Sequence, residues 1–211
     1  MIINSKDYRQ RLDERVKTYD SEAFLVNEIA ARMIERLDYI RFNPRVVLDC
    51  AARTGFSSRL LKKQYPKSML ISQELSDSAL QQRKKTWSWR QPLLVSSAYD
   101  KLPFLTNHVE MIFANLLLPF FDDPKMVFEE WLRVLKPNGM FLFSTFGPDT
   151  FKELNPPSTY MDMHDMGDLL LQQGWVDPVV DMEYLTLEYD HPNQLYDDFS
   201  QMALELLLPQ S

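Results

Sequence analysis

The chain has 211 residues with a formal net charge of -7, 45% hydrophobic residues, 25% charged residues and one cysteine. This length and composition are typical of a globular domain, so we expect one domain over residues 1–211, with an N-terminal helical cap (1–42) and a core sheet with a C-terminal edge (43–211). The single cysteine, Cys50, excludes an internal disulfide and a multi-cysteine zinc site.

The first residues, MIINSKDYRQRLDERVK, are charged and lack the apolar run of a signal peptide. The longest apolar stretch, MIFANLLLPFF (111–121), is shorter than the roughly 20 residues that a transmembrane helix needs. We therefore expect a cytoplasmic protein without a membrane span.

The charge is unevenly distributed along the chain. No Lys or Arg follows Lys152, whereas 12 acidic residues lie between Glu153 and Glu205. The remaining 18 acidic residues and all 23 basic residues give residues 1–152 a charge of +5. This pattern indicates either a solvated acidic C-terminal face or a basic side that attracts an acidic partner, with the bases at 83–85 as first candidates. The negative total charge argues against bulk nucleic-acid binding.

Residues 5–39 have apolar residues at helical spacing, with Tyr19–Ser21 as a cap. Buried-strand patterns follow at RVVLDC (45–50), SMLISQEL (68–75), PLLVSS (92–97), VEMIFANLLL (109–118) and GMFLFSTF (139–146). Amphipathic helices are predicted at FSSRLLKKQY (56–65), SDSALQQRKKTW (76–87) and DPKMVFEEWLRVL (123–135), and KPNG (136–139) is a turn signal.

The C-terminal part begins with a helix around HDMGDLLLQQG (164–174) and ends with a helix from about Asn193 to Leu207. Between them, VVDMEYLTLEY (179–189) alternates and predicts antiparallel edge strands. The alternation of strands and helices predicts an α/β fold with a doubly wound, mainly parallel sheet of seven strands, with the first strand at about 46–50. Because ligands bind beyond the carboxyl ends of such strands, the loops that follow them are candidate sites.

Polar side chains stand at several of these strand ends. Asp49 closes the first strand, and Gly55 opens the next helix after the loop CAARTG. Glu74 ends the second strand, where a carboxylate can accept hydrogen bonds from ribose hydroxyls. Tyr99 follows the third strand, and Asn115 stands at the end of the fourth. Each residue also has a structural interpretation: Asp49 as a loop cap, Glu74 as a solvated acid and Tyr99 as a packing residue. His108, His164 and His191 share no ligand spacing, so no metal site is predicted.

The frame VVLDxxxxTG, the ELS after the second strand, LPF (102–104) and RVLKPNGMFLFSTF together resemble the class I S-adenosylmethionine-dependent methyltransferases. TYDSEA, STFGPDTFKEL and EYLTLEYDHPNQLYDDF are similar to the malonyl-[acyl-carrier protein] O-methyltransferases of biotin synthesis. The mitochondrial methyltransferase-fold assembly factors of respiratory complex I share much of the pattern. The resemblance runs from about Arg15 to Met202.

The resemblance implies a Rossmann-like methyltransferase fold, S-adenosylmethionine as cofactor and an acidic acyl-carrier protein as partner. It implies a catalytic role for Tyr19, which such enzymes place over cofactor and substrate. The cofactor-binding positions that it implies are Asp49, Ala51, Arg53, Gly55, Glu74, Leu75, Tyr99 and Asn115.

The chain departs from the family pattern at the cofactor loop. Two family glycines are replaced by Ala51 and Arg53, and the acid after the third strand by Ala98. A glutamine common in the N-terminal helix is Val26 here. We therefore expect the loop to keep its backbone path but to bind S-adenosylmethionine weakly or not at all, because Arg53 brings bulk and positive charge toward the pocket. Pairing of Arg53 with Glu74 or Asp49 would relieve this charge but would compete for the ribose contact.

Two hypotheses remain open from the sequence. The first is an active O-methyltransferase acting on the free carboxyl of a carrier-bound malonyl thioester. The second is a catalytically impaired or repurposed member of the fold that acts in assembly or interaction. The mitochondrial relatives also suggest a third, protein hydroxylation on the same scaffold.

Overall fold

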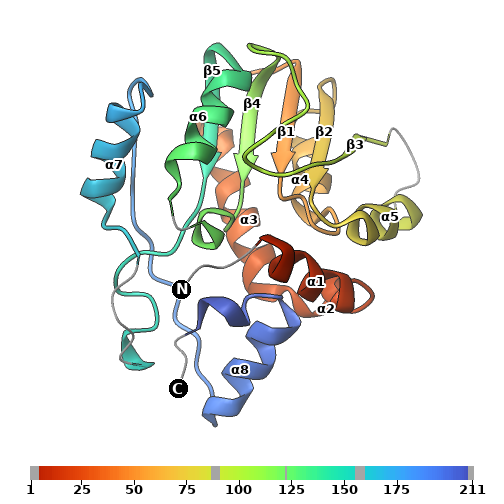
Figure 1. Cartoon of the computed structure of the whole chain (residues 1–211), viewed down its shortest axis with the longest axis vertical. Coiled ribbons are helices and arrows are strands. Elements are labelled where there is room, and N and C mark those ends of the chain that lie inside the picture. Colours follow the sequence, from red (N-terminus) through yellow and green to blue (C-terminus); the bar gives the residue numbers. More distant parts are fainter. Residues whose placement is uncertain (1–4, 87–90, 122, 155–159, 209–211) are drawn as a thin grey trace.

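The computed structural model of the protein describes residues 5–86, 91–121, 123–154 and 160–208, except for the side chains at 5–6 and 84–86. At its centre lies a five-stranded sheet in the order β3-β2-β1-β4-β5 (Figure 1). Its strands are β1 (Val46–Cys50), β2 (Met69–Glu74), β3 (Leu93–Ser96), β4 (Val109–Ala114) and β5 (Leu135–Phe143). All four strand pairs are parallel, which confirms the doubly wound parallel sheet and its first strand.

Helices cover both faces of the sheet because successive strand residues point to opposite sides. The helices in the middle of the chain are α3 (Phe24–Arg36), α4 (Phe56–Gln64), α5 (Asp77–Thr86) and α6 (Lys125–Val134). Val47 and Met111 belong to an apolar cluster with α3 and α4. Their neighbours Leu48 and Ile112 belong to a second cluster that includes α6. The predicted helices on both faces are therefore present.

The prediction of seven strands with an antiparallel edge is wrong for the described residues. They form five strands, all parallel, and residues 179–189 are extended without joining the sheet. Instead, this segment is held by ion pairs: Asp181 and Glu183 bind Arg36, and Glu183 also binds Arg32 on α3. An alternating pattern shows that a chain is extended with two different faces, but it does not identify a hydrogen-bonding neighbour.

The expected turn KPNG (136–139) lies inside β5. The register advances from Val109 opposite Leu135 to Met111 opposite Met140, so the additional residues form an irregularity in the strand. Asn138 within it has a φ of 61°, a left-handed conformation that asparagine tolerates. The turn signal KPNG therefore corresponds to an irregularity within β5 and not to a turn between two elements.

The N-terminal helical prediction is confirmed, but the helix is divided. The pieces are α1 (Ser5–Arg15), α2 (Tyr19–Glu22), α3 and a 3-10 turn at Leu37–Tyr39. Tyr19, expected in a cap, begins α2 instead. α1 packs against α5, and both α1 and α2 lie beyond the carboxyl ends of the strands (Figure 1). The N-terminal segment is thus placed over the expected ligand end of the sheet.

The helix expected from about Asn193 to Leu207 is divided, and the C-terminal segment packs against the rest of the chain. It contains α7 (Met163–Gln172), α8 (Pro192–Gln201) and a 3-10 turn at Glu205–Leu207. α8 packs against α2, and Phe199 is buried in the core. Glu205 pairs with Arg11 and Arg15 of α1. The acidic end of the chain therefore binds the N-terminal helix.

None of the helices in the described part of the chain combines the length and apolarity needed to cross a bilayer. Within the same residues, no three His, Cys, Asp or Glu side chains lie close enough to hold a metal ion. Cys50 is a free, buried thiol, and burial raises its pKa well above the ordinary value, so it stays protonated.

Candidate cofactor site at the carboxyl ends of the strands

The loop after β1 has the backbone of a glycine-rich loop. Ala51, Arg53 and Gly55 have φ angles of 59°, 48° and 95°, so all three are left-handed. Hydrogen bonds from Ala52 N to Gln73 O (3.0 Å) and from Gly55 N to Ala52 O (2.8 Å) hold this path. The path is the expected one. At two of the three positions it is imposed on residues with a Cβ, each at a cost of about 1–2 kcal/mol.

Ala51 and Arg53 stand where the family has glycines, but Gly55 has no room for a side chain. A Cβ at this position would lie 2.6 Å from Nε of Arg83. Arg83 comes from α5 and is 1% exposed. Burial lowers its pKa to about 10, although the nearby Asp49 acts in the opposite direction. Gly55 is therefore required by both its φ and its close contact with Arg83.

Arg53 is buried, with 4% of its surface exposed. Its guanidinium donates hydrogen bonds to the carbonyl oxygens of Asn115 (3.0 Å) and Leu116 (3.2 Å), just after β4. The hydroxyls of Tyr8 and Tyr19 and the carboxylate of Glu74 contribute to the field around it. Burial opposes its charge, but Tyr19 and these neighbours outweigh that effect and raise the pKa of Arg53. The side chain is thus a fixed cation inside the loop region.

Glu74 is at the expected ribose-binding position, but its oxygens bind protein groups. Oε1 accepts hydrogen bonds from the Tyr99 hydroxyl (2.5 Å) and the backbone N–H groups of Leu75 (2.6 Å) and Ser76 (3.2 Å). Oε2 accepts one from the backbone N–H of Arg53 (2.9 Å). Glu74 is fully buried. Its acceptor capacity is therefore used by the protein itself.

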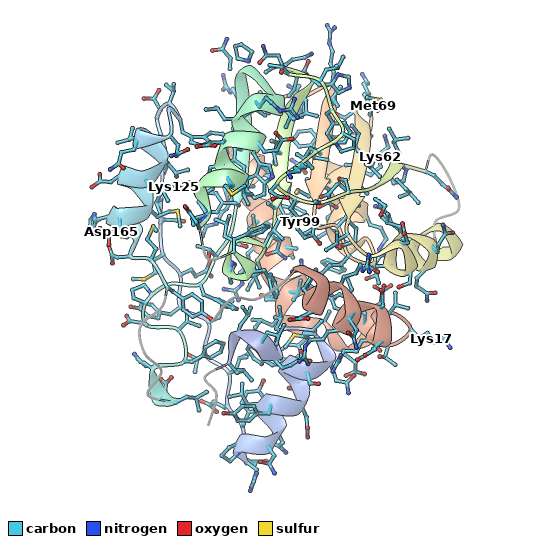
Figure 2. All side chains as sticks on the ribbon, viewed as in Figure 1. Lys17, Lys62, Met69, Tyr99, Lys125 and Asp165 are labelled. Atoms are coloured by element: carbon cyan, nitrogen blue, oxygen red, sulfur yellow. The ribbon has the colours of Figure 1, made fainter. Side chains whose placement is uncertain are left out.

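The N-terminal helices α1 and α2 cover the site at the carboxyl ends of the strands (Figure 1). Tyr8 of α1 is fully buried, with its ring centroid 4.4 Å from that of Phe120 and 6.5 Å from that of Tyr99. Tyr19 of α2 is also buried, and burial raises its pKa to about 12 against the lowering effect of Arg53. Figure 2 places Tyr99 at the centre of the molecule. Three tyrosines thus lie around the Arg53 guanidinium.

Two polar contacts fasten these helices to the loops after the strands. Asp20 of α2 accepts a hydrogen bond from Thr54, in the loop after β1. Asp13 of α1 accepts hydrogen bonds of 2.5 Å from Ser76 and Ser78, after β2. α1 and α2 are therefore attached to the two loops that would face a cofactor.

Asp49 contacts the start of α4, whereas the Arg53 guanidinium contacts the loop after β4. It is buried and accepts hydrogen bonds from Ser57 Oγ (2.8 Å) and Ser58 Oγ at the start of α4. Burial raises its pKa to about 6, against the lowering effects of Ser58 and Arg83. These contacts are with side-chain hydroxyls, and the N-cap position of α4 is held by Gly55 without a side-chain cap, so Asp49 does not cap the helix backbone.

Asn115 is a buried structural link. Its side-chain amide donates to Val26 O (2.8 Å) on α3, and its Oδ1 accepts from Ser144 Oγ (2.8 Å). Val26, at the family's glutamine position, is itself buried. The amide and the backbone carbonyl of Asn115 are therefore both engaged, the latter by Arg53.

The structure brings most of the predicted residues together. Those around the Arg53 guanidinium or Glu74 are Tyr19, Ala51, Arg53, Glu74, Leu75, Tyr99 and Asn115. Asp49 and Gly55 form a second group with Arg83. Sequence reasoning missed Tyr8, Ser57 and Ser58. The serines stand at the N-terminus of a predicted helix, a position that could have identified them as partners of Asp49.

Arg83 corrects the prediction of a surface patch at 83–85, because it is buried. Ala79 and Leu80, four and three residues earlier on α5, are buried too, so Arg83 lies on the inner face of its helix. That spacing was visible in the sequence. The side chains of Lys84 and Lys85 lie outside the described residues.

The arrangement does not fit S-adenosylmethionine, the cofactor that the sequence resemblance implies. This cofactor carries a sulfonium cation and ribose hydroxyls. Here the Arg53 guanidinium places a cation in the loop region, and Glu74 already binds four protein donors. Binding would require Arg53 to leave its carbonyl partners and Glu74 to exchange its donors.

The comparisons with known proteins agree with the fold. Residues 48–143 match the family model described as a methyltransferase domain. A malonyl-[acyl-carrier protein] O-methyltransferase from Gallionella capsiferriformans is 37% identical over 96% of this chain and 76% of that protein. One from Legionella pneumophila is 37% identical over 92% of this chain and 72% of that protein.

Two solved structures share the fold at lower identity. An S-adenosylmethionine-dependent methyltransferase from Aquifex aeolicus has a TM-score of 0.63 and 18% identity, covering 77% of this chain and 87% of that one. One from Thermotoga maritima has a TM-score of 0.61 and 18% identity, covering 79% and 80%. The chain belongs to the class I S-adenosylmethionine-dependent methyltransferase family.

Proposed function

We propose that this chain is a repurposed member of its family that acts in interaction or assembly and does not use S-adenosylmethionine in its unmodified form. The observation that carries this proposal is the Arg53 guanidinium, which is buried and bound to the carbonyls of Asn115 and Leu116. The family implies the cofactor, whose sulfonium cation a buried guanidinium in this loop region would repel.

The energetic argument has two parts. Two like charges at close range in a partly buried site repel by about 1–4 kcal/mol, depending on the effective dielectric constant. This repulsion corresponds to roughly tenfold to several-hundredfold in affinity. In addition, a ribose at Glu74 would displace the Tyr99 hydroxyl or a backbone N–H, leaving a buried donor unpaired. Both effects weaken cofactor binding.

The closed site supports a structural role for these residues. Tyr8 and Tyr19 are buried by the protein's own contacts, and Asp13 and Asp20 fasten α1 and α2 to the loops below. The residues at the ligand end of the sheet therefore form part of the core. A protein of this design retains its surface for partners.

The second candidate function is O-methylation of the free carboxyl of a malonyl thioester on an acyl-carrier protein. It is favoured by the 37% identity to relatives that bear this name. A carboxylate acceptor needs no general base, so positioning would supply most of the rate enhancement. This function would require α1, α2 and Arg53 to move together, after which Tyr19 would face the substrate. The cytoplasmic setting expected from the sequence stays a prediction.

A thermal-unfolding experiment with S-adenosylhomocysteine tests the proposal. A ligand that binds only the folded state raises the melting temperature in proportion to ln(1 + [L]/Kd). We expect no rise at millimolar S-adenosylhomocysteine. A concentration-dependent rise, accompanied by methyl transfer to malonyl-loaded carrier protein, would establish the second candidate instead.

A further inference from the structure

One quarter of the chain is rich in basic residues. Residues 50–99 contain nine Lys and Arg but only two Asp and Glu. Two of the bases, Arg53 and Arg83, are buried, and so is one of the acids, Glu74. Lys63 and Lys67 are exposed at the end of α4 and in the following loop. Together with Lys62, they place three lysines at the end of α4 and in the loop that leads to β2.

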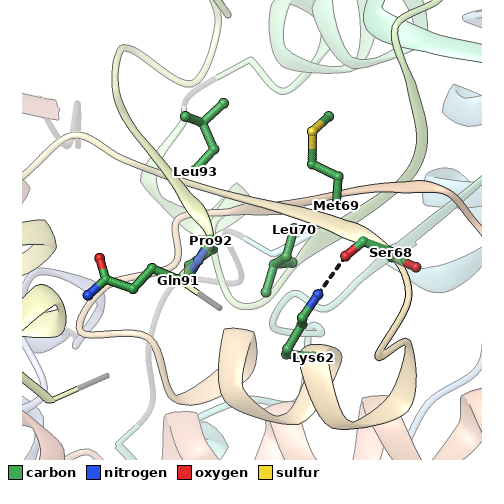
Figure 3. A pocket seen from close by; sticks show the side chains of 7 residues that line it. All are labelled: Lys62, Ser68, Met69, Leu70, Gln91, Pro92 and Leu93. Atoms are coloured by element: carbon green, nitrogen blue, oxygen red, sulfur yellow. Dashed lines mark hydrogen bonds between the residues drawn. The ribbon is translucent and has the colours of Figure 1, made fainter. Parts of the chain in front are cut away.

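A cavity of about 340 Å³ lies beside these lysines, at the amino ends of β2 and β3 (Figure 3). Its walls include Lys62, Ser68, Met69, Leu70, Pro92 and Leu93. Met69 and Leu93 are 47% and 54% exposed, which is high for large apolar side chains. The cavity thus combines an apolar wall with one cation and lies at the opposite end of the strands from the candidate cofactor site.

Lys62 can accept a further partner. Its ammonium donates to Ser68 O (2.7 Å), the contact drawn in Figure 3. An ammonium has three N–H donors, so this bond leaves capacity for a carboxylate. Lys63 and Lys67 form no ion pair with any described residue. The local charge is therefore not neutralised by the chain.

The edge strand β3, beside the cavity, has backbone groups that could bind a partner. β3 stands at the end of the sheet order and pairs only with β2 among the described strands. Exposed edge strands present unpaired N–H and C=O groups that an extended peptide can use. Leu93, the first residue of β3, is also a wall of the cavity.

We propose that this cavity and the edge of β3 form a docking surface for an extended acidic peptide segment of a partner protein. An apolar side chain of the segment lies between Met69 and Leu93, and a carboxylate binds Lys62. The inference rests on the proposed interaction role and names the surface and the partner chemistry for it. The total charge of -7 disfavours an extended polyanion such as nucleic acid, whereas a short acidic segment matches the local basic cluster.

Fluorescence anisotropy with a short labelled peptide of alternating glutamate and leucine tests the surface. A peptide of the same length with lysine in place of glutamate is the control for charge. We expect the acidic peptide alone to bind, and Lys62→Glu or Leu93→Ser to weaken it about tenfold each. Lys125→Glu makes the same charge change on α6, which lies away from Lys62 in Figure 2. It should leave binding unchanged.

The outcomes separate this inference from the proposed function. Absence of peptide binding, or equal weakening by Lys125→Glu and Lys62→Glu, would overturn the docking surface. If the acidic peptide binds as expected while S-adenosylhomocysteine raises the melting temperature of the same sample, the surface stands and the non-catalytic role is wrong. Binding of the lysine peptide with equal affinity would also overturn the surface, since charge selectivity would be lacking.

Discussion

The backbone N–H of Arg53 donates a 2.9 Å hydrogen bond to Oε2 of Glu74. The residue at a position where the family has a glycine is thus joined to the residue at the expected ribose-binding position. Only the backbone of Arg53 reaches this carboxylate: the guanidinium binds the carbonyls of Asn115 and Leu116, so the charge pair with Glu74 or Asp49 considered from the sequence is not formed. Arg53 therefore binds Glu74 through its backbone and the loop after β4 through its side chain.

Restoring the loop glycines should restore cofactor affinity. In the double variant Ala51→Gly, Arg53→Gly, the buried cation is removed and both left-handed positions become unstrained. We expect S-adenosylmethionine to bind at least about tenfold more tightly than to the unmodified chain, measured by calorimetry. Lys125→Ala, which removes an exposed cation from α6, is the control and should change nothing. Equal affinities of the double variant and the unmodified chain would contradict this account of Arg53.

Gly55→Ala should destabilise the fold. The new Cβ would lie 2.6 Å from Arg83 Nε, at a φ of 95°. Left-handed strain and overpacking together should lower the free energy of unfolding by roughly 2–4 kcal/mol, measured by urea denaturation. Gly147→Ala, where nothing lies within 4 Å of the added Cβ, should cost less than about 1 kcal/mol. Similar losses in the two variants would exclude a special role of Gly55.

Asp49 should make the unmodified protein less stable as the pH rises from about 4 to about 6. Burial raises its folded-state pKa to about 6 from the ordinary 3.8, so the folded state holds the proton more tightly than the unfolded chain. The stabilisation from protonated Asp49 is complete below about 3.8 and lost by about 6, a change of roughly 3 kcal/mol at most.

The variant Asp49→Asn isolates this effect, because the other carboxyl groups titrate equally in both proteins. The free energy of unfolding of the variant minus that of the unmodified chain should rise over this pH window. Urea denaturation at several pH values measures the difference. A difference that is constant with pH would show that Asp49 titrates normally.

Glu205→Gln should loosen the C-terminal segment. Glu205 pairs with Arg11 and Arg15, and its side chain is 16% exposed. We expect a loss of about 1 kcal/mol and faster hydrogen exchange in α8. Glu22→Gln, at an exposed position of α2, serves as the control. Unchanged exchange in α8 would show that apolar packing alone docks this segment.

The sequence predicted the βα core well because its signals are local. The five strands from Val46 to Phe143 are short apolar runs that alternate with amphipathic helices, and each was found near its observed position. The edge was predicted wrongly because alternation at 179–189 is satisfied by an extended chain held by Arg32 and Arg36. Strand partners depend on contacts far apart in sequence.

The sequence predicted which residues form the candidate site, but not that α1 and the loop after β4 would bury them. The spacing of Asp49, Gly55 and Glu74 identified the loops, and the φ angles bear out the backbone path. Nothing local indicates that Tyr8 packs on Phe120, more than one hundred residues later. The direction of the Arg53 side chain depends on carbonyls after β4, which no pattern in the loop reveals.

Isothermal titration calorimetry of the unmodified chain with S-adenosylmethionine tests the central claim most directly. With Arg53 buried among Asn115, Leu116 and the tyrosines, we predict no saturable heat at micromolar concentrations of the cofactor. A single-site isotherm with a dissociation constant in the low micromolar range would contradict the claim.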